Sequence, residues 1–240
     1  MSKSSFTITE TKGGISVKKK SNTMANLIEN DLAFERTREN NAEFGRAGKA
    51  ASLFLDAFSP ILPSHITRGA YPRLQSAFFA ALQQDPENER GERQIALGDL
   101  EKLRRFELNN AYKLKSYRVQ ENMALIDRAT GILKVNLPAY VPSNFKRPKK
   151  STHLKMTIGG ASIDFVNERF TNAFMATDFV RINKTPVEGF SLEVNLEANS
   201  VHPLFMLFSI EFHEVMFGKS GRFRNKKYDA VQIVAVSPRP

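Results

Sequence analysis

Hydrophobic and polar residues alternate with a period of two near the C-terminal end of the chain. Every second residue over 204–212 is apolar, whereas Glu211 and His213 point to the opposite face. This period is typical of a β-strand with one buried face. Residues 230–237 are rich in Val and Ile, which favours a second strand. The pattern predicts a long antiparallel hairpin whose loop, residues 218–227, carries five positive charges.

The same period recurs further upstream. Asp127 opens and Gly131 closes one predicted turn, as expected for a hairpin loop with a left-handed glycine. Gly159 and Gly160 lie between two alternating runs and predict a two-residue hairpin turn. The predicted strands and hairpins lie at residues 123–137, 154–165, 173–182 and 190–196. Seven or eight short strands with regular turns favour an antiparallel β-sandwich, Ig-like or jelly-roll-like.

The N-terminal part of the chain follows helical spacing instead. Apolar residues recur every three or four positions in three segments, which predict a three-helix unit. These segments are residues 34–58, 71–85 and 95–106. The predicted fold class is therefore α+β. Its parts are a flexible arm (1–33), a helical unit (34–110) and a β-sandwich domain (111–240).

Small residues form a second stripe along the first predicted helix, at Gly45, Gly48 and Ser52. Glycine inside a helix costs about 1 kcal/mol relative to alanine, so two of them indicate that another backbone approaches closely. One interpretation is tight packing against a helix of the same domain. The other is docking of a second subunit, in which case these residues belong to an oligomer interface.

The composition is that of an ordinary globular protein. The 240 residues are 41% hydrophobic and 25% charged, which suffices to bury a core. The absence of cysteine excludes disulfides and thiolate sites. The sequence contains no apolar run long enough for a transmembrane segment. Because the N-terminus also lacks the apolar part of a secretory signal, we expect a cytoplasmic protein.

Positive charge is concentrated in the C-terminal part of the chain. Residues 1–110 contain 16 Lys/Arg against 14 Asp/Glu, and residues 111–240 contain 19 against 11. Two stretches there combine basic residues with phenylalanine, a pattern that suits contact with a phosphate backbone and stacking on a base. The candidate binding residues are Lys146, Arg147, Lys149, Lys150, Lys219, Arg222, Phe223, Arg224, Lys226 and Lys227. The alternative interpretation is a pair of solvated hairpin tips.

No catalytic or cofactor motif is present. The sequence lacks a nucleophile elbow and both glycine-rich phosphate-binding motifs. Glu211 and His213 share one strand face, but two ligands do not complete a zinc site. A polar, outward-facing strand surface is the simpler interpretation of this pair. We therefore predict no metal, no cofactor and no catalytic residue.

Several segments resemble uncharacterised conserved proteins of Bacteroidota bacteria. They are residues 37–50, 89–93, 126–131, 202–205 and 210–212. The resemblance extends over residues 36–237 and leaves the arm outside. It implies the same two-part layout, and it brings no assigned activity and no catalytic residue.

Three functions are compatible with these features. The leading hypothesis is a non-enzymatic binding or scaffold protein whose basic loops contact nucleic acid or an acidic protein. The second is a self-assembling structural subunit, such as a phage or particle component, joined into a homo-oligomer by the arm and the small-residue stripe. The third is a hydrolase on a sandwich scaffold, which requires a cleft where Glu211, His213 or other carboxylates converge. The binding hypothesis requires the two basic stretches to lie at the same end of the sandwich.

Overall fold

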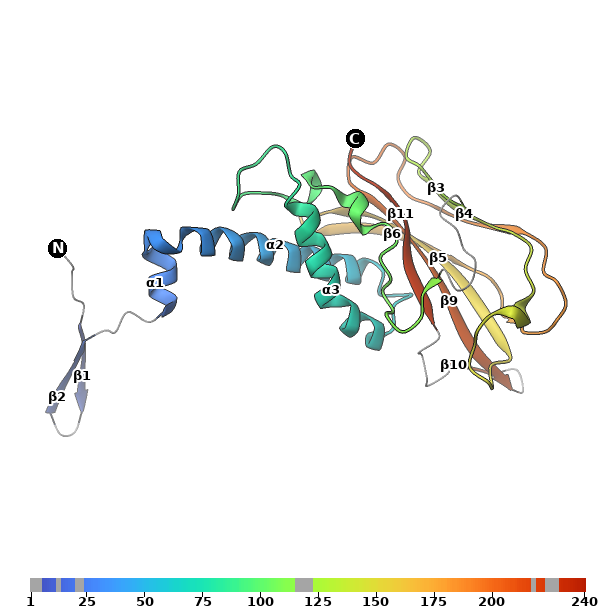
Figure 1. Cartoon of the computed structure of the whole chain (residues 1–240), viewed down its shortest axis with the longest axis horizontal. Helices are drawn as coiled ribbons and strands as arrows, with labels where there is room; N and C mark the ends of the chain where they lie inside the picture. Colours follow the sequence, from blue (N-terminus) through green and yellow to red (C-terminus); the bar gives the residue numbers. More distant parts are fainter. Residues whose placement is uncertain (1–5, 12–13, 20–23, 115–122, 217–218, 223–228) are drawn as a thin grey trace.

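The fold consists of a helical layer, a six-stranded sheet and a three-stranded sheet (Figure 1). The computed structural model describes residues 6–11, 14–19, 24–114, 123–216, 219–222 and 229–240. The helices cover one face of the larger sheet, and the smaller sheet packs on the other. This arrangement confirms the predicted α+β class with a sandwich-like pair of mostly antiparallel sheets.

Two long α-helices dominate the helical layer. The helical elements are α1 (Met24–Asn30), η1 (Leu32–Phe34), α2 (Glu35–Ala57), α3 (Ser64–Leu82), η2 (Ile95–Leu97) and η3 (Leu100–Leu103), with η6 (Pro142–Asn144) between strands. The third predicted helix is thus two short 3₁₀ helices. Gly98 separates them, and a Cβ atom there would lie 2.3 Å from the carbonyl oxygen of Ala81. This segment crosses the end of α3 too closely to continue as a regular helix with side chains.

The strands form two antiparallel sheets beside a separate N-terminal hairpin. They are β1 (Phe6–Thr11), β2 (Gly14–Lys19), β3 (Ala124–Asp127), β4 (Ile132–Leu137), β5 (His153–Asp164), β6 (Arg169–Ala176), β7 (Val180–Arg181), β8 (Phe190–Asn195), β9 (Leu204–Met216), β10 (Lys219–Arg222) and β11 (Ala230–Ser237). The larger sheet has the order β10-β9-β5-β6, with β11 also paired to β9 and β7 to β5. The smaller sheet has the order β3-β4-β8. The pairing of β9 with β11 confirms the predicted C-terminal hairpin.

The hairpin predicted at residues 154–165 is wrong. Gly159 and Gly160 lie inside the single strand β5, which pairs with β9 on one side and with β6 on the other. A Cβ atom on Gly159 would meet the ring of Phe174 at 2.8 Å, and one on Gly160 would meet Leu133 at 2.8 Å. The two glycines therefore make room for close neighbours on both faces of the sheet, as interior strand glycines often do.

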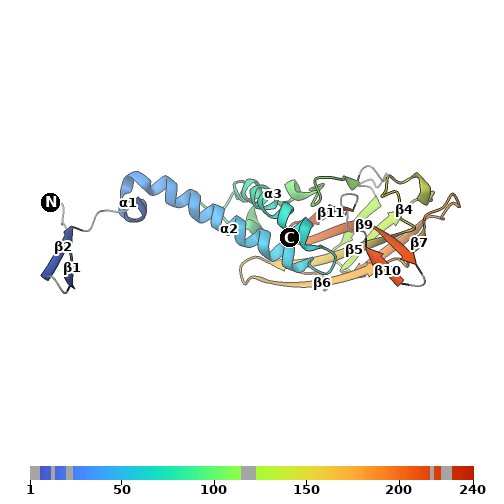
Figure 2. The ribbon, with the colours of Figure 1, turned by 90° about the horizontal axis from the view of Figure 1, so that it is seen from below.

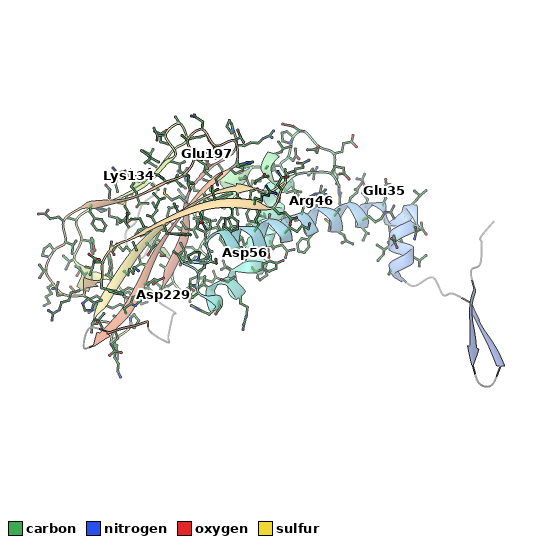
Figure 3. The ribbon with its side chains drawn as sticks, turned by 180° about the vertical axis from the view of Figure 1, so that it is seen from behind. Glu35, Arg46, Asp56, Lys134, Glu197 and Asp229 are labelled. Carbon is green, nitrogen blue, oxygen red and sulfur yellow. The ribbon has the colours of Figure 1, made fainter. Side chains whose placement is uncertain are left out.

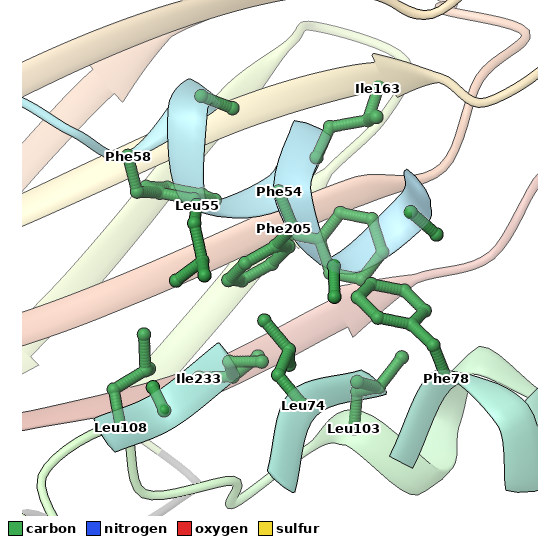
Figure 4. Packing of buried hydrophobic residues seen from close by; sticks show 14 of the residues in the cluster. Phe54, Leu55, Phe58, Leu74, Phe78, Leu103, Leu108, Ile163, Phe205 and Ile233 are labelled. Atoms are coloured by element: carbon green, nitrogen blue, oxygen red, sulfur yellow. The ribbon is translucent and has the colours of Figure 1, made fainter. Parts of the chain in front are cut away.

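The helical layer and the larger sheet share one hydrophobic core (Figure 4). Phe54 of α2 and Phe78 of α3 pack with Phe205 of β9, whose ring centroid lies 5.3 Å from that of Phe54. On the other face of β9, a second core between the two sheets contains Met206, Phe208, Ile210 and Phe212. The predicted alternation of β9 is therefore present, and both of its faces are buried in the first half of the strand.

The N-terminal arm contains secondary structure that the sequence analysis did not predict. Strands β1 and β2 pair antiparallel, with Phe6 opposite Lys19 and Thr11 opposite Gly14. In Figures 1 and 2 this hairpin and α1 stand away from the packed body. The signal for the hairpin was the β-branched content of the two short runs, which favours strands.

Candidate anion-binding site

Strand β9 brings the first predicted basic stretch and β10, the described part of the second, to the same end of the larger sheet. His213 of β9 is the register partner of His153 on β5 and of Arg222 on β10. Neighbouring strands lie about 4.8 Å apart, so these three backbones lie side by side. Figures 1 and 2 show β10 at the end of the molecule opposite the N-terminal hairpin. The geometric condition for the binding hypothesis is therefore met.

Hydrogen bonds of Thr152 fix the first basic stretch against this end. The Thr152 amide donates to the His213 carbonyl at 3.0 Å, and its carbonyl accepts from the Ile182 amide at 2.8 Å. The Thr152 hydroxyl accepts from the Val215 amide at 2.8 Å and lies 2.9 Å from Nδ1 of His153. Residues 146–151 thus lead directly into the first residues of β5, beside β9.

The four predicted cations of the first stretch have different surroundings. The Lys146 ammonium lies 5.4 Å from the centre of the Tyr112 ring, which is a cation–π contact. The Arg147 guanidinium turns back and donates to the Ser143 carbonyl at 2.8 Å. Lys149 and Lys150 are exposed. The two neighbouring lysines are consequently the best placed of the four for an external partner.

The second basic stretch is described only in part. Lys219 and Arg222 belong to β10, which pairs with the end of β9. Phe223, Arg224, Lys226 and Lys227 lie outside the described residues. Two further cations are exposed nearby, Arg181 in β7 and Lys184 shortly after it. Arg181 is the register partner of His153.

Among the described residues, Phe179 is an exposed aromatic residue at this end that was not predicted from the sequence. It is 41% exposed, and its ring centroid lies 4.9 Å from His213 and 6.5 Å from His153. The Lys155 ammonium lies 5.8 Å from the same ring. The sequence did contain a signal for this residue, because Phe179 lies two positions before Arg181. The same combination of an aromatic and a basic residue marked the two predicted binding stretches. Phe145, by contrast, stacks on Tyr140 with an interplanar angle of 7°.

His213 lies on the predicted outer face of β9, but its side chain is buried rather than exposed to solvent. His213 is only 8% exposed, and its Nε2 lies 3.3 Å from Oε2 of Glu211. The face assignment was right, because both residues lie opposite the inter-sheet core. The side chain is nevertheless buried, since Phe179 from the β6–β7 connection packs on it.

His153 titrates below its ordinary range. Burial, followed by the nearby Arg181 and His213, holds its pKa below the usual 6.5. His153 is therefore mainly neutral at pH 7. A bound anion would favour its charged form, because a nearby opposite charge raises the pKa of an imidazole.

The charges at this end of the sheet suit electrostatic binding of an anion. Within the described residues, no group of three or more His, Cys, Asp or Glu side chains is placed to hold a metal ion. Residues 141–157 contain five Lys/Arg and no Asp/Glu. Such a one-signed stretch beside an exposed aromatic ring suits a negatively charged chain.

The three residues of the small-residue stripe separate in the structure. Gly48 is buried on α2, and a Cβ atom there would lie 2.9 Å from Nε2 of Gln75 on α3. The packing interpretation therefore explains Gly48. Gly45 and Ser52 are exposed, and their role at an oligomer interface stays a prediction.

Comparison of the chain with known protein families, with characterised proteins and with solved structures gives no match. The resemblance to Bacteroidota proteins therefore stays a prediction. Among the helices that the structure describes, none combines the length and apolar character needed to cross a bilayer.

Proposed function

We propose that this protein is a non-enzymatic binding protein whose basic end contacts a nucleic acid strand. The observation that supports the proposal is the strand register, in which His213 of β9 lies between His153 of β5 and Arg222 of β10. Phe179 favours nucleic acid over an acidic protein, because an exposed aromatic ring among cations can stack on a base. An acidic protein would use the same cations and would leave that ring unused.

Charge reversal of the exposed lysines tests the electrostatic part of the proposal. Full-length protein is titrated with a labelled single-stranded dT20 and its duplex counterpart over a salt series. If about four phosphates are neutralised, the logarithm of the single-strand affinity falls with the logarithm of salt with a slope of about −3. Lys149→Glu combined with Lys150→Glu is expected to weaken binding at least about tenfold at low salt and to flatten that slope by about 1.4.

The matched control reverses two cations away from the basic end, Arg36 on α2 and Lys102 on η3. This variant has the same net charge, so unaltered affinity assigns the effect to the basic end rather than to overall charge. Absence of any binding to either nucleic acid at low ionic strength would contradict the proposal.

Replacing Phe179 with alanine separates a nucleic acid partner from an acidic protein. Loss of base stacking is expected to weaken dT20 binding about 5- to 150-fold, because one base–aromatic stack contributes about 1–3 kcal/mol. Binding of polyglutamate, which has no bases, is expected to change little. Phe170→Ala is the control, since Phe170 is a 38% exposed ring elsewhere on the larger sheet. Equal losses for both polymers would contradict base stacking, and unchanged binding of both would instead indicate an acidic protein partner.

A self-assembling subunit is the second candidate function. It is favoured by the β1–β2 hairpin, which stands away from the body (Figure 2). The outer edges of this two-stranded sheet pair with no other described strand, and such edges invite pairing with another chain. Light scattering over a range of protein concentrations tests it. A particle mass that increases with protein concentration, and that no longer does so after deletion of residues 1–23, supports assembly. A mass that stays that of the monomer contradicts it.

A further inference from the structure

A cavity of about 300 Å³ lies at the other end of the larger sheet. It is bounded by the middle of α2, by residues 92–96, which lead into η2, and by the turn at residues 165–168 between β5 and β6. Strand β5 separates this turn from His153 by about 36 Å, given about 3.3 Å for each residue. The volume is at the lower end of the range for small-molecule sites. The cavity is thus separate from the candidate anion-binding site.

Much of the cavity wall is apolar and firmly held. Leu53, Ile95 and Phe165 contribute large side chains to it. The Phe165 ring contacts Phe78 at a centroid distance of 5.6 Å and Phe205 at 6.1 Å. Because those two rings are fully buried, the wall is an extension of the hydrophobic core. It offers a preformed surface for the carbon part of a ligand.

Two side chains of α2 hold the loop beside the cavity. Glu43 accepts a hydrogen bond from the Gly91 amide at 2.8 Å, and Arg46 donates to the Gly91 carbonyl. Gly91 has a φ of +94°, and a Cβ atom there would meet Glu39 at 2.9 Å. The loop is therefore held at a glycine, and the same contact fixes the Arg46 guanidinium at the cavity wall. Figure 3 shows the position of Arg46 on α2.

Arg46 differs from its neighbouring cations in having no carboxylate partner. Arg93 lies 3.8 Å from Glu43, and Lys49 lies 2.8 Å from Glu168. Within the described residues Arg46 forms no ion pair, and its buried Nε has no hydrogen-bond acceptor. An unpaired guanidinium N–H beside an apolar wall is costly unless an acceptor is supplied. Because Arg46 also lines the cavity, a carboxylate bound there would supply the negative charge that this guanidinium lacks.

We propose that this cavity binds a small organic monoanion, a carboxylate with an apolar carbon chain. The carboxylate accepts hydrogen bonds from Arg46, a pairing that guanidinium geometry favours. The chain lies against Leu53, Ile95 and Phe165. Glu92 and Glu168 also line the cavity, and their negative charges oppose a polyphosphate or any other polyanion. The cavity is therefore expected to prefer a monoanion, whereas the basic end is expected to prefer a polyanion.

Binding of sodium octanoate and of 1-octanol to the full chain tests this proposal. Titration calorimetry is expected to give octanoate at least about tenfold higher affinity, because a charge-assisted hydrogen bond accounts for that factor or more. Arg46→Gln is expected to abolish this preference while octanol binding remains. Arg36→Gln, an exposed arginine on the same helix, is the matched control and leaves both affinities unchanged.

A second variant guards against a folding defect, because Arg46 also holds Gly91. Ala96→Leu fills the cavity and leaves Arg46 in place, and it is expected to remove binding of both ligands without a fall in the unfolding temperature. Equal affinities for octanoate and octanol, or absence of octanoate binding at millimolar concentration, would overturn the proposal. Unchanged binding in Ala96→Leu would also overturn it, because the ligand would then lie elsewhere.

Discussion

Replacing Phe205 with alanine is expected to lower the free energy of unfolding by about 3–5 kcal/mol, the usual cost of removing a buried phenylalanine. Phe205 is completely buried. Its ring contacts Phe54 of α2, Phe78 of α3 and Phe165 at the end of β5, at centroid distances of 5.3, 6.5 and 6.1 Å. The substitution therefore leaves a cavity where the helices meet the sheet.

Urea denaturation followed by circular dichroism measures this effect. Because one core joins helices and sheet, we expect a single transition in the wild type and in Phe205→Ala. Phe170→Ala, which shortens a 38% exposed ring, is the control and is expected to change stability by less than about 1 kcal/mol. Two separated transitions, with the helices unfolding first, would contradict the shared core.

Replacing Gly131 with alanine is expected to destabilise the protein by about 3 kcal/mol or more. Gly131 closes the β3–β4 turn with a φ of +77°, and an added Cβ atom would lie 2.3 Å from the Leu196 carbonyl oxygen. The cost combines backbone strain with a clash against backbone that cannot rotate away. The Gly131 carbonyl also accepts from the Leu196 amide at 2.9 Å, so relief of the clash would break this hydrogen bond.

The matched control is Gly69→Ala on the exposed side of α3. A Cβ atom there meets nothing within 4 Å, and alanine is the better helix former by about 1 kcal/mol. The unfolding temperature is expected to rise for Gly69→Ala and to fall for Gly131→Ala. A similar small change in both variants would show that the turn tolerates a side chain.

The fold class could be predicted from local patterns because those patterns depend on few distant neighbours. Asp127 and Gly131 define their turn by their own chemistry, and the period of two in residues 204–212 reflects one buried face. The prediction at Gly159 and Gly160 was wrong because these glycines are needed for tertiary packing and not for a turn. They accommodate Phe174, Ile61, Leu133 and Val194, which lie far away in sequence. A glycine pair inside a strand and a glycine pair in a turn look alike in the sequence.

The candidate binding site was predictable in composition but not in placement. The cations at residues 146–150 and 219–227 are visible in the sequence. Their meeting depends on the register of β5 and β10 with β9, which no local signal encodes. Burial of His213 depends on Phe179, a residue from a connection between two other strands. For the same reason the Arg46 cavity was invisible, since it needs α2, the η2 segment and a distant turn together.

Hydrogen exchange with and without dT20 tests most directly whether both basic stretches form one binding site. The account predicts slower amide exchange on binding in residues 149–155 and in residues 213–222, because these backbones flank each other across β9. Residues 43–53 of α2 serve as the internal reference and are expected to exchange unchanged. Slower exchange in only one of the two basic stretches, or at α2 instead, would contradict the account.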